Sequence, residues 1–570
     1  MCALALPVAA DEGMWLFNQF PKAQVKEKHG VEVSDEFLEH LRLSSVRIGG
    51  GSGAFVSPNG LILTNYDVAS ECISRLSNAE HDYVRNGFYA AGGVGEIRCP
   101  GMEANLRYTD LRLVFAPEFG IAYFGGDQDK FTYPRYDFDI AFLRAYENGK
   151  PASTPQYLKW SAEGAKDTEL VFVAGNPSTT SRLATGSQLA FYRDCQLPLQ
   201  LGRLQSRITL LREFGAKSDA NRLAAQRTLS GFSNRYKSSA GKLIGLKDQR
   251  LMARKLGFER RLRKSVENDP KLGEEAAKVW DQVALAYKNW APMERAYELL
   301  EQPAAQGSAL FRIARNIVRH QKETIESPAA IDEGVEIALL GLYLEELKSL
   351  GEKDVPLKTI LQVRTPQEAA EAIVRGSRLK DNNPMIQLAE ALEAPARKIR
   401  KKCEESIESL KASSLDKIAQ YRFKAMGAAD YPDATSTPRV AFGVVKAYRD
   451  KTEAPAPWAT TFGGLYHRAG KEEPYILPQR WVDAKPLLDP ITPFNFVSTA
   501  DITDGPTVNA KGEITGIVVD GNIESLSRTY LYSEEQARAV HVAAQGIVEA
   551  LKTVYHATDL LKELDRPVLQ

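Results

Sequence analysis

Short apolar runs separated by turn residues dominate the chain from about residue 46 to residue 198. The segment GAFVSPNGLILTN holds two such runs around Ser57-Pro58-Asn59-Gly60, and an Asn-Gly pair tolerates the positive φ angles of a hairpin turn. A second Asn-Gly pair follows DIAFLRAYE, and ELVFVAG is an apolar run that ends at a turn. This part of the sequence therefore predicts short β-strands.

The pattern changes at about residue 201, where apolar residues begin to recur at spacings of three and four. The stretch AIDEGVEIALLGLYLEELKSLG predicts one amphipathic helix, and the pattern continues to about residue 427. Lys, Arg and Glu fill the positions between the apolar ones, with the two signs in balance. We interpret these charges as solvated helix faces.

Strand patterns return from about residue 431, where ITGIVVDGN follows the turn residues 509–512. We expect an amphipathic helix at about 534–564 to close the chain. The order β, α, β predicts a β domain completed by both ends of the chain, with a helical insertion. The predicted parts are a signal-peptide remnant at 1–10, a first β part at 11–200, a helical domain at 201–430 and a second β part at 431–570.

Composition and charge exclude several classes of protein. The chain has 73 basic and 73 acidic residues, which argues against a basic nucleic-acid surface. No apolar run is long enough to span a bilayer. The start, MCALALPVAA, resembles the end of a secretory signal peptide with cleavage near Ala10, so we expect a periplasmic or secreted protein.

Cysteine and glycine patterns narrow the chemistry further. The five cysteines form no C-x-x-C pair, which argues against a zinc or redox motif. In an exported chain Cys72 and Cys99 form either a disulfide or two buried thiols, and the sequence leaves both open. GGGSGAF is followed by strand signals rather than by a helix, so it does not predict a phosphate loop. We expect no cofactor and no metal.

Several blocks carry a family resemblance. They are DEGMW, GGSGAFVSPNGLILTN, HDYVRNGFYA, FGGDQDKFTYPRYDFDIAFLRAY, GFSNRYKSSAGKLIGLKD, YPDAT, TPFNFVSTADIT and NAKGEITGIVVDGNIES. In this order they resemble the exported bacterial dipeptidyl-peptidases of the seven and eleven type, serine peptidase family forty-six. The resemblance implies an α+β protein: a chymotrypsin-like double β-barrel, split in sequence by a large helical domain. It also implies an enzyme that removes dipeptides from free N-termini.

The catalytic pattern of that family is not intact here. Its motif Thr-Asn-His-His, whose second histidine is the general base, corresponds to Thr64, Asn65, Tyr66 and Asp67. A carboxylate is a poor base for a serine hydroxyl. The family acid corresponds to Asp139 in PRYDFDIAF, but the histidine that this acid would orient is absent. If the barrel closes as in the family, Asp67 and Asp139 are neighbours and one of their pKa values rises.

The nucleophile loop is missing rather than substituted. The family pattern Gly-Gly-Asn-Ser-Gly-Ser-Pro follows the Ser-Thr-x-Asp-Ile block, whereas here STADIT leads directly into DGPTVNAKGE. Thr503 lies beside this gap and Thr507 follows it, and neither has a visible base or oxyanion hole. His81 is the nearest other histidine in the motif blocks, at a position that the family does not use as base. A second shortening joins Leu106 to Arg107, so we expect a truncated first barrel.

The resemblance implies that more of the substrate-binding residues remain. The asparagine and the aspartate that hold the substrate's ammonium group correspond to Asn234 and Asp520, and a tryptophan position holds Phe131. Gly521 corresponds to the position that distinguishes two groups of family members. One group prefers an apolar residue next to the cleaved bond, and the other carries an arginine at this position and prefers an acidic residue. Glycine implies the apolar preference. Turn capping is the alternative role for Asn234 and Asp520.

The sequence thus favours an inactive homologue that binds peptide N-termini or an unidentified periplasmic protein. Two alternatives stay open: an active dipeptidyl aminopeptidase with relocated catalytic groups, and a purely structural subunit with a filled pocket. A serine or threonine close to His81 would favour the first alternative, and a collapsed cleft would favour the second. The family's dimers imply a homodimer.

Overall fold

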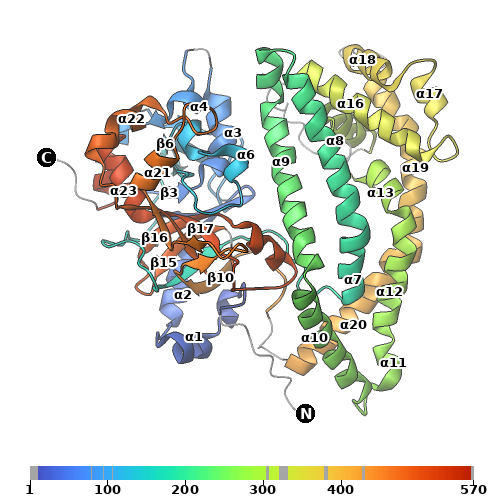
Figure 1. The fold of residues 1–570 in the computed structure, drawn as a ribbon, viewed down its shortest axis with the longest axis horizontal. Coiled ribbons are helices and arrows are strands. Elements are labelled where there is room, and N and C mark those ends of the chain that lie inside the picture. The colour runs from blue at the N-terminus through green and yellow to red at the C-terminus, as the bar shows by residue number, and fades with distance from the viewer. Residues whose placement is uncertain are drawn as a thin grey trace. The chain divides into compact units, whose positions relative to one another are not determined.

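The computed structural model describes residues 11–78, 80–93, 95–105, 107–302, 307–319, 331–377, 383–426, 431–502 and 504–565. The expected signal peptide at 1–10 and Leu106 therefore lie outside the described residues. The chain divides into two compact units. The first contains Met1–Leu183 and Met426–Gln570, and the second contains Ala184–Ala425 (Figure 1).

One sheet of the first unit is built by the N-terminal part of the chain. Its described strands follow the order β1-β2-β3-β7-β6-β4, with β5 paired to β6 and β8 paired to β7. The neighbours on this path are antiparallel. The strands are β1 (Ser45–Ile48), β2 (Gly51–Phe55), β3 (Leu61–Thr64), β4 (Phe88–Tyr89), β5 (Ile97–Arg98), β6 (Asp110–Ala116), β7 (Ala141–Glu147) and β8 (Lys150–Pro151).

The turns of this sheet lie where the sequence predicted them. Phe55 on β2 pairs with Ile62 on β3 across the Asn59-Gly60 turn, and Gly60 has a φ of 73°. A Cβ atom on Gly60 would lie 2.7 Å from the Ala145 carbonyl oxygen, so both the backbone angle and the packing require glycine. The second Asn-Gly turn joins β7 to β8, and the hairpin predictions are confirmed.

A second sheet combines one strand from the first part of the chain with strands from the last part. Its order is β10-β9-β15-β16-β17-β14-β13, and an isolated antiparallel bridge joins Val445, just beyond β10, to Ser498 on β14. The strands are β9 (Leu170–Gly175), β10 (Arg439–Val444), β13 (Ala459–Thr461), β14 (Pro493–Ser498), β15 (Gly505–Asn509), β16 (Ile514–Gly521) and β17 (Ala539–Ala543). A separate hairpin consists of β11 (Tyr448–Arg449) and β12 (Pro455–Ala456).

The expected closing helix at 534–564 is wrong in about its first third. Ala539–Ala543 forms β17, which lies between β14 and β16 and is buried at every residue. A strand that is buried on both faces lacks the alternation of polar and apolar residues that distinguishes a strand from a helix. The pattern therefore gave no signal against a helix at these positions. Helices follow only from Ala544 onward, as α23 (Ala544–Thr553) and α24 (Thr558–Glu563).

The largest hydrophobic core of the first unit lies between its two sheets. It takes Leu63 and Phe142 from the first sheet and Phe172 and Ile517 from the second, all fully buried. The remaining short helices of this unit are η1 (Phe17–Gln19), α1 (Lys22–His29), α2 (Asp35–Ser44), α3 (Tyr66–Leu76), α4 (Tyr83–Asn86), η2 (Ala91–Gly93), α5 (Phe119–Ala122), α6 (Gly126–Asp129), α21 (Phe462–Arg468), α22 (Gln479–Ala484), η8 (Lys485–Leu487) and η9 (Ile523–Thr529).

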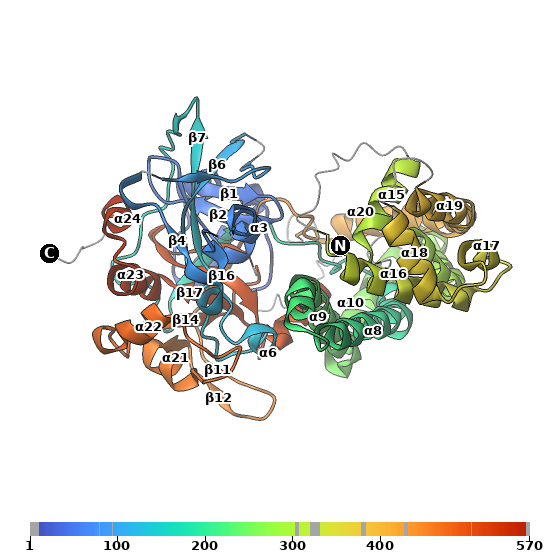
Figure 2. The same cartoon turned by 90° about the horizontal axis from the view of Figure 1, so that it is seen from above.

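The second unit is helical throughout its described residues. Its elements are α7 (Gly186–Phe191), η3 (Tyr192–Gln196), α8 (Leu197–Gly215), α9 (Asp219–Lys247), α10 (Gln249–Glu267), α11 (Gly273–Ala277), α12 (Val279–Trp290), η4 (Ala291–Met293), α13 (Glu294–Glu301), α15 (Ala309–Val318), α16 (Glu333–Leu347), η5 (Lys348–Leu350), α17 (Leu357–Leu361), α18 (Pro366–Gly376), α19 (Pro384–Cys403), η6 (Glu404–Glu408) and α20 (Ser409–Met426). The long helices α8 and α9 run side by side, as Figures 1 and 2 both show.

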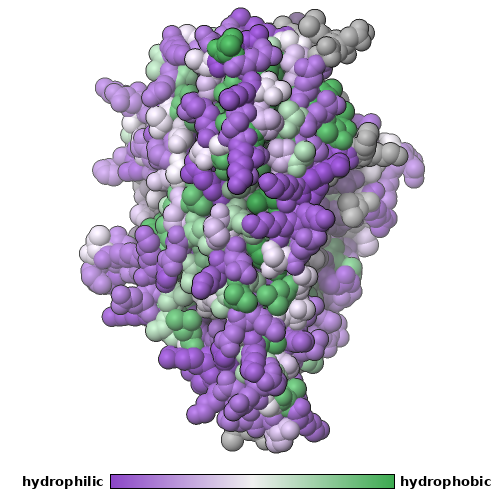
Figure 3. All heavy atoms as spheres, turned by 90° about the vertical axis from the view of Figure 1, so that its right-hand side faces the viewer, coloured by the Kyte–Doolittle hydropathy of each residue, from purple (hydrophilic) through white to green (hydrophobic). Residues whose placement is uncertain are grey.

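One face of the helical unit is mostly hydrophilic. In Figure 3 charged and polar side chains cover this face, and hydrophobic residues lie between them in small scattered groups. This agrees with the interpretation of the balanced charges as solvated helix faces. Among the described helices, none has the length and apolar character that crossing a membrane requires.

A disulfide joins α3 to the segment after β5. The Cys72 and Cys99 Cα atoms are 5.0 Å apart, and 27 positions separate the two residues in sequence. The structure thus decides for the disulfide over the two free thiols.

Replacing both Cys72 and Cys99 with serine is expected to lower the free energy of unfolding by about 3 to 4 kcal/mol, because the open chain regains the entropy of that loop. Urea denaturation measures this change. Cys195→Ser, at a cysteine outside the disulfide, is the control and is expected to change stability far less. An equal loss in both proteins would contradict a specific role for the disulfide.

Candidate functional site

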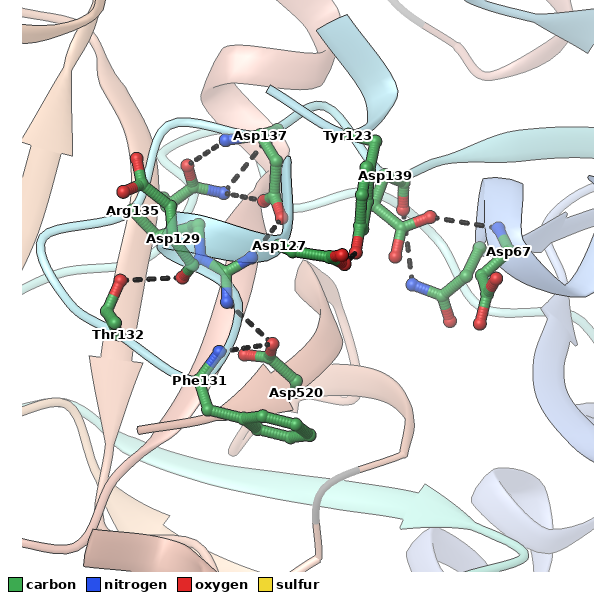
Figure 4. Close-up of polar contacts among 12 residues, drawn as sticks. Asp67, Tyr123, Asp127, Asp129, Phe131, Thr132, Arg135, Asp137, Asp139 and Asp520 are labelled. Atoms are coloured by element: carbon green, nitrogen blue, oxygen red, sulfur yellow. Dashed lines mark hydrogen bonds and ion pairs between the residues drawn. The ribbon is translucent and has the colours of Figure 1, made fainter. Parts of the chain in front are cut away.

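Strand pairing brings Asp67 and Asp139 together. Thr64 at the end of β3 pairs with Ala141 at the start of β7, so the residues just beyond the two strands meet at one edge of the sheet. The Asp67 backbone N–H donates a hydrogen bond to the Asp139 carboxylate over 3.1 Å (Figure 4). The expectation that these two aspartates are neighbours is confirmed.

Their proximity changes the chemistry of Asp139. Burial raises the pKa of the Asp139 carboxyl well above its ordinary value, and the charges of Asp67 and Asp137 raise it further. A carboxyl with a raised pKa keeps its proton to a higher pH than an ordinary aspartate does. The pair lacks the imidazole that would link such an acid to a nucleophile.

Arg135 is the centre of a buried ion triad. One guanidinium nitrogen lies 2.9 Å from the Asp137 carboxylate, and another lies 2.6 Å from the Asp520 carboxylate. The side chains of Arg135 and Asp137 are 3 % and 5 % exposed, and that of Asp520 is 11 % exposed. Burial alone would lower the pKa of Arg135, but the two carboxylates raise it overall. Burial raises the pKa of Asp137 to about 6, although Arg135 opposes this shift.

The triad leaves one carboxylate oxygen of Asp520 without a partner. Arg135 and the Phe131 backbone N–H both contact Oδ2, whereas Oδ1 is buried with no hydrogen bond among the described residues. When both carboxylates are ionised, the triad holds one positive and two negative charges, so its net charge is negative. Figure 4 shows the Phe131 side chain next to Asp520. Phe131 has a φ of 59°, an uncommon angle for a bulky residue.

Gly521 is enclosed by its own neighbours. A Cβ atom at this position would lie 2.1 Å from Ser525 Oγ and 2.9 Å from the Arg538 carbonyl oxygen. Contacts below 3.0 Å force the surroundings to move. Packing therefore gives this position a reason to be glycine that is separate from any substrate preference.

Asn234 and Thr503 are the two remaining candidates from the sequence. Asn234 belongs to α9 of the helical unit, and its side-chain oxygen is buried without a hydrogen bond among the described residues. Thr503 lies outside the described residues. Beside it, Ser52 donates a hydrogen bond to Asp504 over 2.7 Å, and burial raises the pKa of Asp504 to about 6.

Neither His81 nor His541 combines accessibility with a hydroxyl partner in the described part of the chain. His81 is exposed and stacks on Tyr83, and no serine or threonine hydroxyl is hydrogen-bonded to it there. His541 on β17 does have two hydroxyl partners, because Ser498 and Thr507 each lie 2.8 Å from one ring nitrogen. However, His541 is fully buried, and this burial lowers its pKa to about 3.

Among the described residues, no group of three or more His, Cys, Asp or Glu side chains is arranged to hold a metal ion. The acidic residues near Asp139 instead have protein partners: Tyr123 donates to Asp127 over 2.7 Å, and Arg468 pairs with Asp129 over 2.7 Å.

A protein-family model, Peptidase S46, matches residues 10–106, 102–334 and 330–566. The chain belongs to the peptidase S46 family. The match is divided at residues 102–106, next to the Leu106–Arg107 junction where the sequence indicated a shortened segment.

Curated relatives align along the whole chain. An Asp/Glu-specific dipeptidyl-peptidase of Shewanella putrefaciens is 26% identical over 717 residues, covering 98% of this chain and 97% of the relative. Dipeptidyl-peptidase 7 of Phocaeicola vulgatus is 22% identical over 710 residues, covering 99% and 98%. Both alignments are longer than the 570 residues of this chain, because the relatives contain segments that it lacks.

A solved structure in this family shares the fold. The crystal structure of Porphyromonas endodontalis DPP11 in complex with the dipeptide Arg-Glu has a TM-score of 0.85 and 18% identity. The similarity covers 98% of this chain and 100% of that one. It confirms a mixed α and β fold of the DPP11 kind. The match to the family model confirms the family resemblance read from the motif blocks.

Sequence reasoning missed the residues that hold Asp520. Arg135 and Asp137 lie within the motif block PRYDFD, but only Asp139 was assigned a role there. The contact from Arg135 to Asp520 joins positions 385 apart, which no local pattern reveals. The available signal was a basic residue in a motif block, FGGDQDKFTYPRYDFDIAF, that also contains four aspartates.

Proposed function

We propose that this S46 protein has lost hydrolysis and keeps a site for the free ammonium group at a peptide N-terminus. The unpartnered Asp520 Oδ1 carries the proposal. Arg135 and the Phe131 N–H occupy the other oxygen and fix the carboxylate, so one acceptor is left. An ammonium group supplies three donors, and its charge would neutralise the triad.

The surroundings favour a cation at this place. The Phe131 side chain adds an aromatic ring to the site, and aromatic faces attract cations. The free N-terminus of a peptide meets both requirements, whereas an acetylated one has lost its charge. Asn234 is proposed as a second ligand of the ammonium group, and Gly521 is proposed to accompany an apolar preference.

The proposed loss of hydrolysis rests on three changes in the family pattern. Asp67 stands at the base position, the serine loop is missing beside Thr503, and the oxyanion-hole donors of that loop are missing with it. Removing triad members from serine peptidases lowers turnover on the order of 10⁴- to 10⁶-fold. Asp139, whose pKa is raised, then has no histidine to orient, because Asp67 replaces the histidine base of the family.

The finer fold and the location belong to the same proposal. We take the two sheets as the two barrels of a chymotrypsin-like fold, the first one truncated, with the helical unit as an insertion. The Val445–Ser498 bridge, which links β10 to β14, supports a closed second barrel. The Cys72–Cys99 disulfide supports a periplasmic or secreted protein, because disulfides persist in oxidising compartments. A peptide or protein of that compartment is the proposed partner.

Two measurements test the proposed function. Fluorogenic dipeptide substrates are expected to show no turnover above buffer, and a fluorophosphonate probe is expected to leave the protein unlabelled. A tripeptide with a free N-terminus is expected to bind at least 10-fold more tightly than its N-acetylated form, measured by calorimetry. Asp520→Asn is expected to remove this preference.

Asp167→Asn is the matched control, since Asp167 is exposed on the same unit. Its preference for the free N-terminus is expected to equal that of the unchanged protein. Turnover that follows the purified protein would contradict the loss of hydrolysis. Equal affinity for the free and acetylated peptides would contradict the ammonium site and favour the purely structural alternative.

A further inference from the structure

The helical unit contains a polar cavity of about 290 Å³. It is lined by residues of η3, α8, α9 and α13 and by Gln302, which follows α13. The lining holds three arginines, three glutamines, one glutamate and one leucine. Its volume lies near the lower end of the range for small-molecule sites. Seven of these eight residues are polar or charged, and polar groups buried among helices need hydrogen-bond partners.

Some of those groups have no partner. Arg203 contacts Glu298 through Nη2 over 2.7 Å, but its Nε and Nη1 atoms are buried without a hydrogen bond in the described part of the chain. The same holds for Glu298 Oε2. The Glu298 side chain is 10 % exposed, so these groups cannot be satisfied by bulk water alone.

The charge balance of the cavity favours an anion. Arg207 is neutralised by Glu346, whose two oxygens both lie 2.9 Å from its guanidinium nitrogens. Glu298 is the acidic residue of the lining, and Glu294, which accepts a hydrogen bond from Gln196, lies close enough to act electrostatically on Arg203. Burial raises the pKa of Glu298 to about 7 and also raises the pKa of Glu294. Near neutral pH these two carboxyls therefore balance the charges of Arg203 and the exposed Arg235 only in part.

The lining also selects among anions. Guanidinium groups match planar carboxylates as well as phosphates. The side chains of Gln196, Gln200 and Gln302 each carry both a hydrogen-bond donor and an acceptor. They therefore complement a ligand amide, which also donates and accepts, better than further oxygens of a phosphate. We propose that this cavity binds a small organic carboxylate with an amide group, of about the size of one amino acid, at the arginine pair Arg203 and Arg235.

Calorimetry with the full chain and three probes tests the proposal. L-glutamine has both groups, L-glutaminamide lacks the carboxylate, and inorganic phosphate lacks the amide. L-glutamine is expected to bind at least 10-fold more tightly than either of the other two. Arg203→Gln is expected to abolish binding. Arg212→Gln, an exposed arginine on the same helix α8 that does not line the cavity, is expected to leave it unchanged.

A second variant protects the test against misfolding. Gln200→Trp fills the cavity without removing a charge, so it is expected to abolish binding while far-ultraviolet circular dichroism stays unchanged. Asp520→Asn is expected to bind L-glutamine as the unchanged protein does, which separates this cavity from the proposed ammonium site. L-glutaminamide or phosphate binding as tightly as L-glutamine, or binding retained in both cavity variants, would overturn the proposal.

Discussion

Arg135→Met is expected to lower the free energy of unfolding by about 3 to 5 kcal/mol, because it leaves two buried carboxylates without their cation. Asp137 and Asp520 both contact the Arg135 guanidinium within 3 Å, and all three side chains are almost inaccessible to water. Methionine retains much of the volume, so the loss measures mainly the uncompensated charge. Chemical denaturation monitored by tryptophan fluorescence gives the change.

Two further variants define the interpretation of this result. Arg107→Met removes a guanidinium that is 66 % exposed and pairs with Glu147, and it is expected to lower the stability far less than Arg135→Met does. Adding Asp520→Asn to Arg135→Met is expected to recover part of the stability, since one buried charge is removed. A loss in Arg135→Met as small as that in Arg107→Met would mean that the triad is not buried as described.

His541 is expected to make the first unit sensitive to acid. Burial lowers the pKa of His541 to about 3, whereas an unfolded histidine titrates near pH 6.5. Between these values the unfolded chain binds the extra proton, so the stability that His541 contributes is complete above pH 6.5. It decreases by roughly 1.4 kcal/mol per pH unit as the pH falls toward 3.

The contribution of His541 is measured by a difference, because Asp137 and Asp504, with raised pKa values, act in the opposite direction. The stability advantage of the unchanged protein over His541→Asn is expected to shrink by about 3 kcal/mol between pH 7 and pH 4. His81→Asn, which removes an exposed imidazole, is the control. An advantage that stays constant over this range would show that His541 is already protonated in the folded protein, or that its surroundings open to water.

Local signals in the sequence predicted much of the fold. The Asn59-Gly60 pair predicted a hairpin and residues 509–512 predicted a turn before a strand. The structure contains both, because the positive φ angles at Gly60 and Gly512 are set by a few neighbouring residues. The helix pattern near residue 340 corresponds to α16. In contrast, β17 was missed because its environment is decided by the two strands that flank it, which lie far away in the chain.

The sequence predicted the residues of the candidate site only where they belong to a motif of the family. The pairing of Asp67 with Asp139 followed from the family pattern, and strand register explains it. The contacts of Asp520 with Arg135, and of Arg203 with Glu298, depend on how separate elements pack. Neither the hydrophobic period nor the spacing of charges along the chain specifies such packing.

The place of β9 in the second sheet has a consequence for synthesis on the ribosome. Its two neighbours are β10, where Arg439 pairs with Gly175, and β15, where Thr507 pairs with Val173. At roughly 5 to 20 residues per second, these partners emerge on the order of tens of seconds after β9. During that time the apolar side chains of Val171, Phe172 and Val173 have no sheet to join. The nascent chain therefore depends on chaperones, or on the early folding of the helical unit, to keep this strand from associating with other chains.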